Sequence, residues 1–348
     1  MKKLKFLYSF LLATVVYTSS SLAQQDPNLN KQIQQGGAAI QDCKDCKSNK
    51  SSDILAQTNE LAAVLNKPFE CAPGDDPQSC LLIDWLKWKH QNYNKNCQGF
   101  FLDGKGQVGP FSKVLAELMT TDIKKNKEKS LFVNDNEQFQ KLCPGFDKFS
   151  LNQKLAFHGW IFELTAFPEN VCTNANSIVK GVNSSAACML QLNYPTNMRS
   201  FYSSGAKNAD GTSEKHCQIS PKELLTDRGC LSCGFDVYKW HMTKYDGNPF
   251  GEIANGKKIN GSYWASQNPL PSAAESCFEK YLDAKSDVKK DPKTGKPLFL
   301  TQCKSLGANW EWTPRYKFFK RIQRFPLCNT EIAKREVTEL KKYLDSKK

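Results

Sequence analysis

Apolar residues recur at helical spacing along most of this 348-residue chain. The pattern predicts helices over residues 54–65, 81–93, 111–123, 137–142, 151–167, 221–225, 235–245, 272–282, 315–325 and 331–344. Convincing runs of alternating polarity, the mark of half-buried strands, are few, and no internal repeat stands out. We therefore expect a mainly helical fold.

The predicted helix at 151–167 is almost entirely apolar. Ser150 and Gln153 form a capping-box signature before it, so the helix should begin at Leu151. Pro168 disfavours a helical conformation of the residue before it, so the helix should end there. These bounds place Glu163 near the last turn, at the edge of an apolar face.

Glu163 is the main chemical candidate in the sequence. Glu163 and Glu169 are followed by a long stretch, residues 170–209, that contains no aspartate or glutamate. A carboxyl group in apolar surroundings has a raised pKa, which keeps it protonated near neutral pH and able to protonate a leaving oxygen. On this residue alone, the alternatives to a general acid are an awkward core residue and an exposed structural glutamate at a helix end.

The N-terminus has the organisation of a secretory signal peptide. Lysines at positions 2, 3 and 5 precede an apolar run over residues 6–17, and Ser21-Leu22-Ala23 provides a cleavage site before Gln24. The apolar run is short for an uncleaved membrane anchor, which is the alternative. We expect a secreted or periplasmic protein, and cleavage would lower the formal charge from +13 to +10 by removing three lysines.

Cysteine usage agrees with export. An even number of cysteines in an exported chain indicates disulfide bonds, whose pairing the sequence does not reveal. The expected disulfide cysteines are Cys43, Cys46, Cys71, Cys80, Cys97, Cys143, Cys172, Cys188, Cys217, Cys230, Cys233, Cys277, Cys303 and Cys328. The two Cys-x-x-Cys pairs have metal-site spacing, but they are far apart in sequence, and we interpret them as structural bridges rather than zinc or redox sites.

The order of motifs from Glu163 onward resembles the lysozyme-like superfamily, in its soluble lytic transglycosylase and goose-type lysozyme branch. In that branch a catalytic glutamate ends a helix, a Gly-Leu-Met-Gln motif lines the sugar cleft, an Asn-Ile-x-x-Gly motif opens a later helix, and an Ala-Tyr-Asn motif supplies a tyrosine. Residues 187–191 (Ala-Cys-Met-Leu-Gln) are similar to the second motif, and residues 230–234 (Cys-Leu-Ser-Cys-Gly) to the third. The resemblance covers about residues 149–268.

The resemblance implies roles for individual residues. Glu163 corresponds to the catalytic acid, and Tyr263, with Trp264 as its rival, to the motif tyrosine. The expected substrate-binding residues are Met189, Gln191, Tyr194, Tyr263 and Trp264. Three features depart from the family pattern: Leu164 stands where the family has serine, the motif glycine is missing, and Ala-Tyr-Asn is only partly kept.

The implied reaction is cleavage of peptidoglycan glycan strands. A carboxylate acting alone, first as acid and then as base, fits a lytic transglycosylase, whereas hydrolysis calls for a second carboxylate or a nucleophile, for which Asp227 and Asp236 are candidates. Two non-enzymatic alternatives stay open. One is a wall-binding or inhibitor protein on a lysozyme-like scaffold, and the other is a disulfide-rich scaffold that binds protein partners through its N-terminal helices.

The chain is basic, and its composition changes along its length. A basic exported chain suits an anionic cell-wall or membrane surface, for which the aromatic and basic segment 315–325 is a candidate, although packing of that segment on the domain is the simpler interpretation. We expect a monomer without metal, cofactor or nucleic-acid partner. The expected layout is a signal peptide (1–23), a polar disulfide-pinned arm (24–53), an N-terminal helical region (54–145), a lysozyme-like domain (146–275) and a helical C-terminal extension (276–348).

Overall fold

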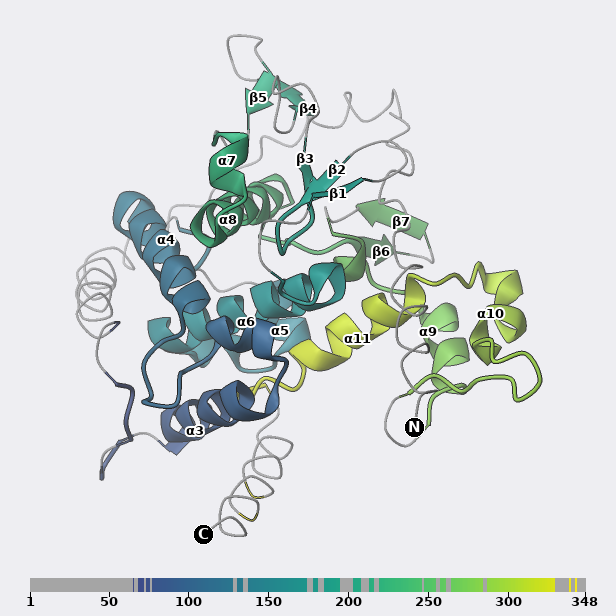
Figure 1. Cartoon of the computed structure of the whole chain (residues 1–348), viewed down its shortest axis with the longest axis horizontal. Coiled ribbons are helices and arrows are strands. Elements are labelled where there is room, and N and C mark those ends of the chain that lie inside the picture. The colour runs from purple at the N-terminus through teal and green to yellow at the C-terminus, as the bar shows by residue number, and fades with distance from the viewer. Residues whose placement is uncertain are drawn as a thin grey trace, which may run out of the picture.

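The structure is a computed structural model and is mainly helical (Figure 1). It describes residues 65, 68–71, 73–75, 77–127, 130–133, 137–173, 178–180, 185–194, 203–207, 213–215, 219–245, 247–254, 257–260, 264–283, 287–328, 338 and 342. The expected signal peptide and polar arm lie outside the described residues, as do the helices predicted at 54–65 and 331–344 except for residues 65, 338 and 342.

Helix α6 (Leu151–Asn170) forms the centre of the molecule. Its N-terminus has the predicted capping box, in which the Ser150 hydroxyl accepts from the Gln153 backbone and the Gln153 side chain accepts from the Ser150 backbone. Nearly every residue from Leu151 to Ala166 is buried, so the helix is enclosed rather than amphipathic. Helices α4 (Pro110–Asn126) and α11 (Trp312–Ile322) and the 3-10 helix η1 (Lys95–Phe100) pack around it.

Five other helices lie where the sequence pattern predicts a helix, with shifted ends: α3 (Pro77–Asn92), α5 (Glu137–Leu142), α7 (Pro221–Leu224), α8 (Asp227–Lys244) and α9 (Ser272–Glu279). Four short helices of the described residues were not predicted: η3 (Phe146–Lys148), η4 (Ala265–Gln267), α10 (Leu298–Gln302) and η5 (Lys304–Leu306). The largest difference is at α8, which begins eight residues before the predicted start because Thr226 caps it by accepting from the Gly229 backbone.

Seven short strands interrupt the helices in the part of the chain that the structure describes. The first three, β1 (Ile178–Lys180), β2 (Ser185–Ala187) and β3 (Leu192–Tyr194), form one antiparallel sheet in the order β1-β2-β3. Two further antiparallel pairs consist of β4 (Ser203–Lys207) with β5 (Ser213–Lys215), and β6 (Glu252–Ala254) with β7 (Lys257–Asn260). Figure 1 shows the β1–β3 sheet on one side of α6 and α11 on the other.

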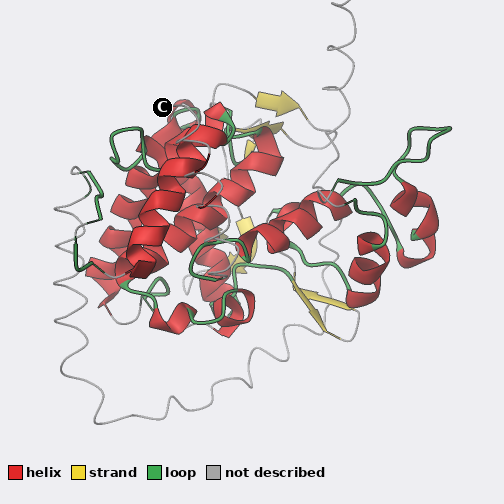
Figure 2. Ribbon diagram, turned by 90° about the horizontal axis from the view of Figure 1, so that it is seen from below, coloured by secondary structure: helices red, strands yellow, loops and turns green. Residues whose placement is uncertain are grey.

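Two hydrophobic cores hold the described chain together. The larger core runs from Leu65 to Leu327 and joins the expected N-terminal region to the expected lysozyme-like domain, with Trp85 packed edge-on against Trp160 of α6. The smaller core lies in a lobe around α9 and α10, where Phe278 packs on Phe299. Figure 2 shows this lobe projecting from the main helical body.

Disulfide bonds connect distant parts of the fold, as the cysteine count predicted. The pairs are Cys71–Cys80, Cys97–Cys172, Cys143–Cys328, Cys188–Cys230 and Cys277–Cys303. Cys233 is also disulfide-bonded, whereas Cys43, Cys46 and Cys217 lie outside the described residues. Among the described helices, none combines the length and the apolar character needed to cross a bilayer.

Helix α11 contains most of the aromatic and basic segment predicted at 315–325, and it packs as a structural element. Phe318, Ile322 and the following Phe325 are buried in the larger core, and Lys320 pairs with Glu275 and Glu279 of α9. The simpler interpretation of this segment is therefore the one that the structure supports.

Candidate active site at the end of helix α6

Helix α6 is longer than predicted, and this changes which glutamate ends it. The helix passes through Pro168 and ends at Asn170, so the expected stop before Pro168 is wrong. Proline removes one backbone donor, but the last turn still closes, because the Val171 N–H donates to the Phe167 carbonyl at 2.8 Å. The next residue, Cys172, is tied to η1 by its disulfide bond.

Glu163 lies seven residues before the end of α6, in the interior of the protein. Its side chain has 0% exposure, and neither carboxylate oxygen has a hydrogen-bond partner of normal geometry. A carboxylate oxygen lies within 4.8 Å of the sulfur atoms of Cys97 and Cys172, which are bonded to each other and so offer no thiolate to a metal.

Burial raises the pKa of Glu163 to about 8, although the positive charges of Arg321 and Lys89 and the neighbouring Tyr93 hydroxyl act in the opposite direction. The same burial, with the Glu163 carboxyl beside it, raises the pKa of Tyr93. The raised pKa agrees with the sequence argument, but the location does not, because a sealed carboxyl group has no surface that a glycan strand could contact. We therefore assign Glu163 a structural position in the core.

Glu169 is the glutamate at the end of α6. The residue as a whole is partly exposed, and its Oε1 accepts a 3.3 Å hydrogen bond from the Ser266 hydroxyl. Ser266 belongs to η4, which is fixed to α6 one turn earlier by a 2.8 Å hydrogen bond from Gln267 to the Thr165 hydroxyl. The carboxyl group of Glu169 is therefore held in place by a buried serine.

The pKa of Glu169 is raised to about 7. Removal from water is the main cause, the Ser266 hydrogen bond opposes it, and the negative charge of Glu311 at the N-terminus of α11 raises the pKa further. A carboxyl group that titrates near neutral pH is suited both to give and to take a proton at that pH. Glu169 is thus a partly exposed residue, whereas Glu163 is fully buried, and it has the acidity that a general acid needs.

The two motif regions that the sequence singled out meet in space. Cys188 in the turn between β2 and β3 is bonded to Cys230 in the first turn of α8. A side chain on Gly234 would overlap Leu190 Cδ1 and would lie 3.6 Å from the Phe162 ring of α6. The absence of a side chain at Gly234 therefore lets α8, the 188–191 turn and α6 pack together.

Two of the expected substrate-binding residues are core residues instead. Met189 has 0% exposure. Trp264 has 3% exposure, and its indole N–H donates to the Leu190 carbonyl at 2.9 Å, so the ring positions the turn rather than presenting a face to a sugar. The expectation that Met189 and Trp264 bind substrate is therefore wrong, because both side chains are buried.

The remaining expected contacts are distributed differently. Gln191 is partly exposed with a left-handed backbone, and its amide donates to the Cys188 carbonyl at 3.2 Å. Tyr194 lies in β3, but its side chain is outside the described part of the structure, as is all of Tyr263. Gln191 therefore remains the one described candidate for contact with a substrate.

His158, five residues before Glu163 on α6, is a core residue. It has 0% exposure, its Nδ1 lies 3.0 Å from the Tyr238 hydroxyl, and aromatic rings surround it. Burial lowers the pKa of His158 to about 3, so it is neutral at neutral pH. Asp227 is the first residue of α8, and Asp236 is exposed on the same helix.

The sequence did contain a signal for Glu169. The stretch without carboxylates begins directly after Glu169, which lies six positions after Glu163. A helix that ended before Pro168, as predicted, would have left Glu169 outside it, whereas the observed helix includes Glu169. Searches against protein-family models, curated proteins and solved structures found no match for this chain.

Proposed function

We propose that this protein cleaves the glycan strands of peptidoglycan, with Glu169 rather than Glu163 as the catalytic acid. The observation that carries the proposal is a carboxyl group with a pKa of about 7 on a partly exposed residue at the end of the central helix. An antiparallel sheet follows that helix directly, and the 188–191 turn, one residue of which is Gln191, connects two of its strands. The motif resemblance and the disulfide-rich, exported character of the chain support the choice of substrate.

Glu169 would act first as an acid. In its protonated form it donates a proton to the glycosidic oxygen as the bond to the sugar carbon breaks. The carboxylate that results then takes a proton from the attacking hydroxyl, which is the sugar's own 6-hydroxyl in a transglycosylase and water in a hydrolase. Ser266 holds one carboxyl oxygen in place during both steps.

A digestion assay with matched variants tests this assignment. We expect wild-type protein to release soluble fragments from purified peptidoglycan, and Glu169→Gln to lower the rate by about a hundredfold or more, since general acid catalysis contributes about that much. Glu163→Gln should keep the rate within a few-fold, because this residue is sealed from substrate. Full activity of Glu169→Gln would refute the assignment, and loss of activity in Glu163→Gln alone would restore Glu163 as the acid.

The masses of the products separate the two mechanisms. Anhydro-muramyl ends indicate a transglycosylase, and reducing ends indicate a hydrolase of the lysozyme type.

Binding without catalysis is a second candidate, which two departures from the family pattern favour: Leu164 in place of the serine after the catalytic glutamate, and the only partly kept Ala-Tyr-Asn motif. In that case wild-type protein would sediment with peptidoglycan but release no fragments at any pH from about 5 to about 8, a range that includes the Glu169 pKa of about 7.

A further inference from the structure

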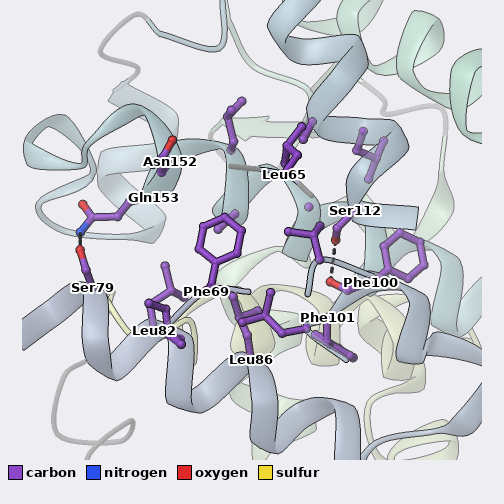
Figure 3. Close-up of a pocket in the computed structure, with 18 of the residues that line it drawn as sticks. Leu65, Phe69, Ser79, Leu82, Leu86, Phe100, Phe101, Ser112, Asn152 and Gln153 are labelled. Atoms are coloured by element: carbon purple, nitrogen blue, oxygen red, sulfur yellow. Dashed lines mark hydrogen bonds between the residues drawn. The ribbon is translucent and has the colours of Figure 1, made fainter. Parts of the chain in front are cut away.

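A cavity of about 250 Å³ lies beside the first half of α6, and the α6 residues that line it end at Gly159, ten positions before Glu169. Its walls come from α3, η1, α4 and the first half of α6 (Figure 3). The lining is mostly apolar and includes Leu82, Leu86, Phe101, Leu115 and Leu155. Neither Glu163 nor Glu169 is among the residues that line it.

The polar groups of the cavity gather toward one end. Figure 3 shows Ser79, Asn152 and Gln153 together on one side, with Phe100, Phe101 and Ser112 on the other. Gln153 donates to the Ser79 hydroxyl at 3.1 Å, which joins the first turns of α3 and α6. Asn152 at the same end is exposed. At the opposite end, the Ser112 hydroxyl is already used, because it donates to the Phe100 carbonyl at 2.6 Å.

This arrangement fits a molecule with a polar head and a single apolar chain. No charged side chain is among the lining residues, so nothing there would oppose an apolar chain. At the polar end, the positive ends of the α3 and α6 dipoles favour a negatively charged head, and the Asn152 amide can donate to it. The volume lies between a cavity that holds benzene, about 150 Å³, and the pockets of drug-sized ligands, about 300 Å³ or more.

Gly159 is a second and independent sign that this space is maintained. It lies in the middle of the central helix, where glycine is less stable than alanine. A Cβ at this position would meet only Ser112 Oγ, at 3.7 Å, an ordinary contact. Packing therefore does not require glycine here, and the missing side chain leaves room in the cavity that Gly159 lines.

We propose that this cavity binds a medium-chain fatty acid, with the alkyl chain between α4 and α6 and the carboxylate at the Ser79–Asn152 end. The site is separate from Glu169, and the proposal does not depend on glycan cleavage.

Calorimetric titration of the delipidated full-length protein with decanoate tests the proposal. We expect saturable binding in the micromolar range, weaker for hexanoate because less apolar surface is buried, and weaker for palmitate because its chain exceeds the cavity. Gly159→Leu should weaken decanoate binding by about tenfold or more by filling the cavity, whereas Gly159→Ala should change it by about threefold or less.

A second pair of measurements examines the head group. Asn152→Ala should weaken binding of decanoate by about threefold and leave decanol unchanged, as expected for loss of one hydrogen bond to a charged group at an exposed site. Ala116→Leu, on the α4 wall, replaces Gly159→Leu if that variant does not fold.

Three outcomes would overturn the proposal. They are the absence of saturable binding by wild-type protein, undiminished binding by a folded Gly159→Leu or Ala116→Leu variant, and binding of a neutral aromatic probe by a protein that does not bind decanoate. Since binding is measured directly, an inactive Glu169→Gln variant that still binds decanoate would separate this site from the proposed catalytic one.

Discussion

Glu163 should make the protein less stable as the pH rises, and Glu163→Gln should remove that effect. Its pKa is about 8 in the folded protein and 4.5 when unperturbed. Below pH 4.5 both the folded and the unfolded protein hold the proton, so Glu163 does not reduce the free energy of unfolding. Between pH 4.5 and 8 only the unfolded protein has lost the proton, so the free energy of unfolding falls as the pH rises. At pH 7, about 2.5 pH units above the unperturbed pKa, the cost is about 3 kcal/mol at about 1.4 kcal/mol per unit.

Urea unfolding with the disulfides intact measures this directly. Glutamine has the shape of the protonated acid, so the variant and the wild type should have equal free energies of unfolding at pH 4.5 and differ by about 3 kcal/mol at pH 7, with the variant more stable. Other titrating groups contribute to both proteins and cancel in the difference. Glu70→Gln, at an exposed position, is the control and should follow the wild type at each pH. Parallel curves for wild type and Glu163→Gln would refute the burial argument.

Substitutions at four further positions test the geometry around α6. Gly234→Ala should destabilise the protein by about 1–3 kcal/mol, because the new side chain would overlap Leu190. Adding Leu190→Ala should recover part of that loss in a double-mutant cycle. Strictly additive effects of the two substitutions on the free energy of unfolding would contradict the close approach of residues 190 and 234. Val171 is 41% exposed and has a left-handed backbone, with φ 51°, which is unfavourable for a residue with a side chain. Val171→Gly should therefore raise the free energy of unfolding by about 1 kcal/mol, whereas Val171→Ala should not. Glu311→Gln should lower the pKa of Glu169, so the loss of digestion activity with rising pH should occur at lower pH than in wild type; an unchanged profile would show that the two charges do not interact.

The sequence pattern predicted helices well because burial of an apolar face is a local property. It described the start of α6 correctly, since a capping box depends only on Ser150 and Gln153. The prediction was wrong at the end of the same helix, where a disulfide bond joins Cys172 to Cys97, a residue 75 positions earlier in the sequence. It also missed the β1–β3 sheet, because strands of three residues are too short to show alternation.

Candidate chemistry was harder to predict than helices, because reactivity depends on exposure. A raised pKa was predicted for Glu163 and found, yet the desolvation that raises it also seals the carboxyl group. Met189 and Trp264 show the same limit, since apolar motif residues have the same sequence pattern whether they line a cleft or fill a core.

Glu311 also weakens the sequence argument for a carboxylate that works alone. That argument depended on the absence of acidic residues from 170 to 209, and it favoured a transglycosylase. Folding brings Glu311, from the other end of the chain, close enough to raise the pKa of Glu169. Distance along the chain therefore says little about whether a second carboxylate is present. If Glu311 activates water, Glu311→Gln should abolish the release of reducing ends; if it only tunes Glu169, the same products should appear with a shifted pH profile.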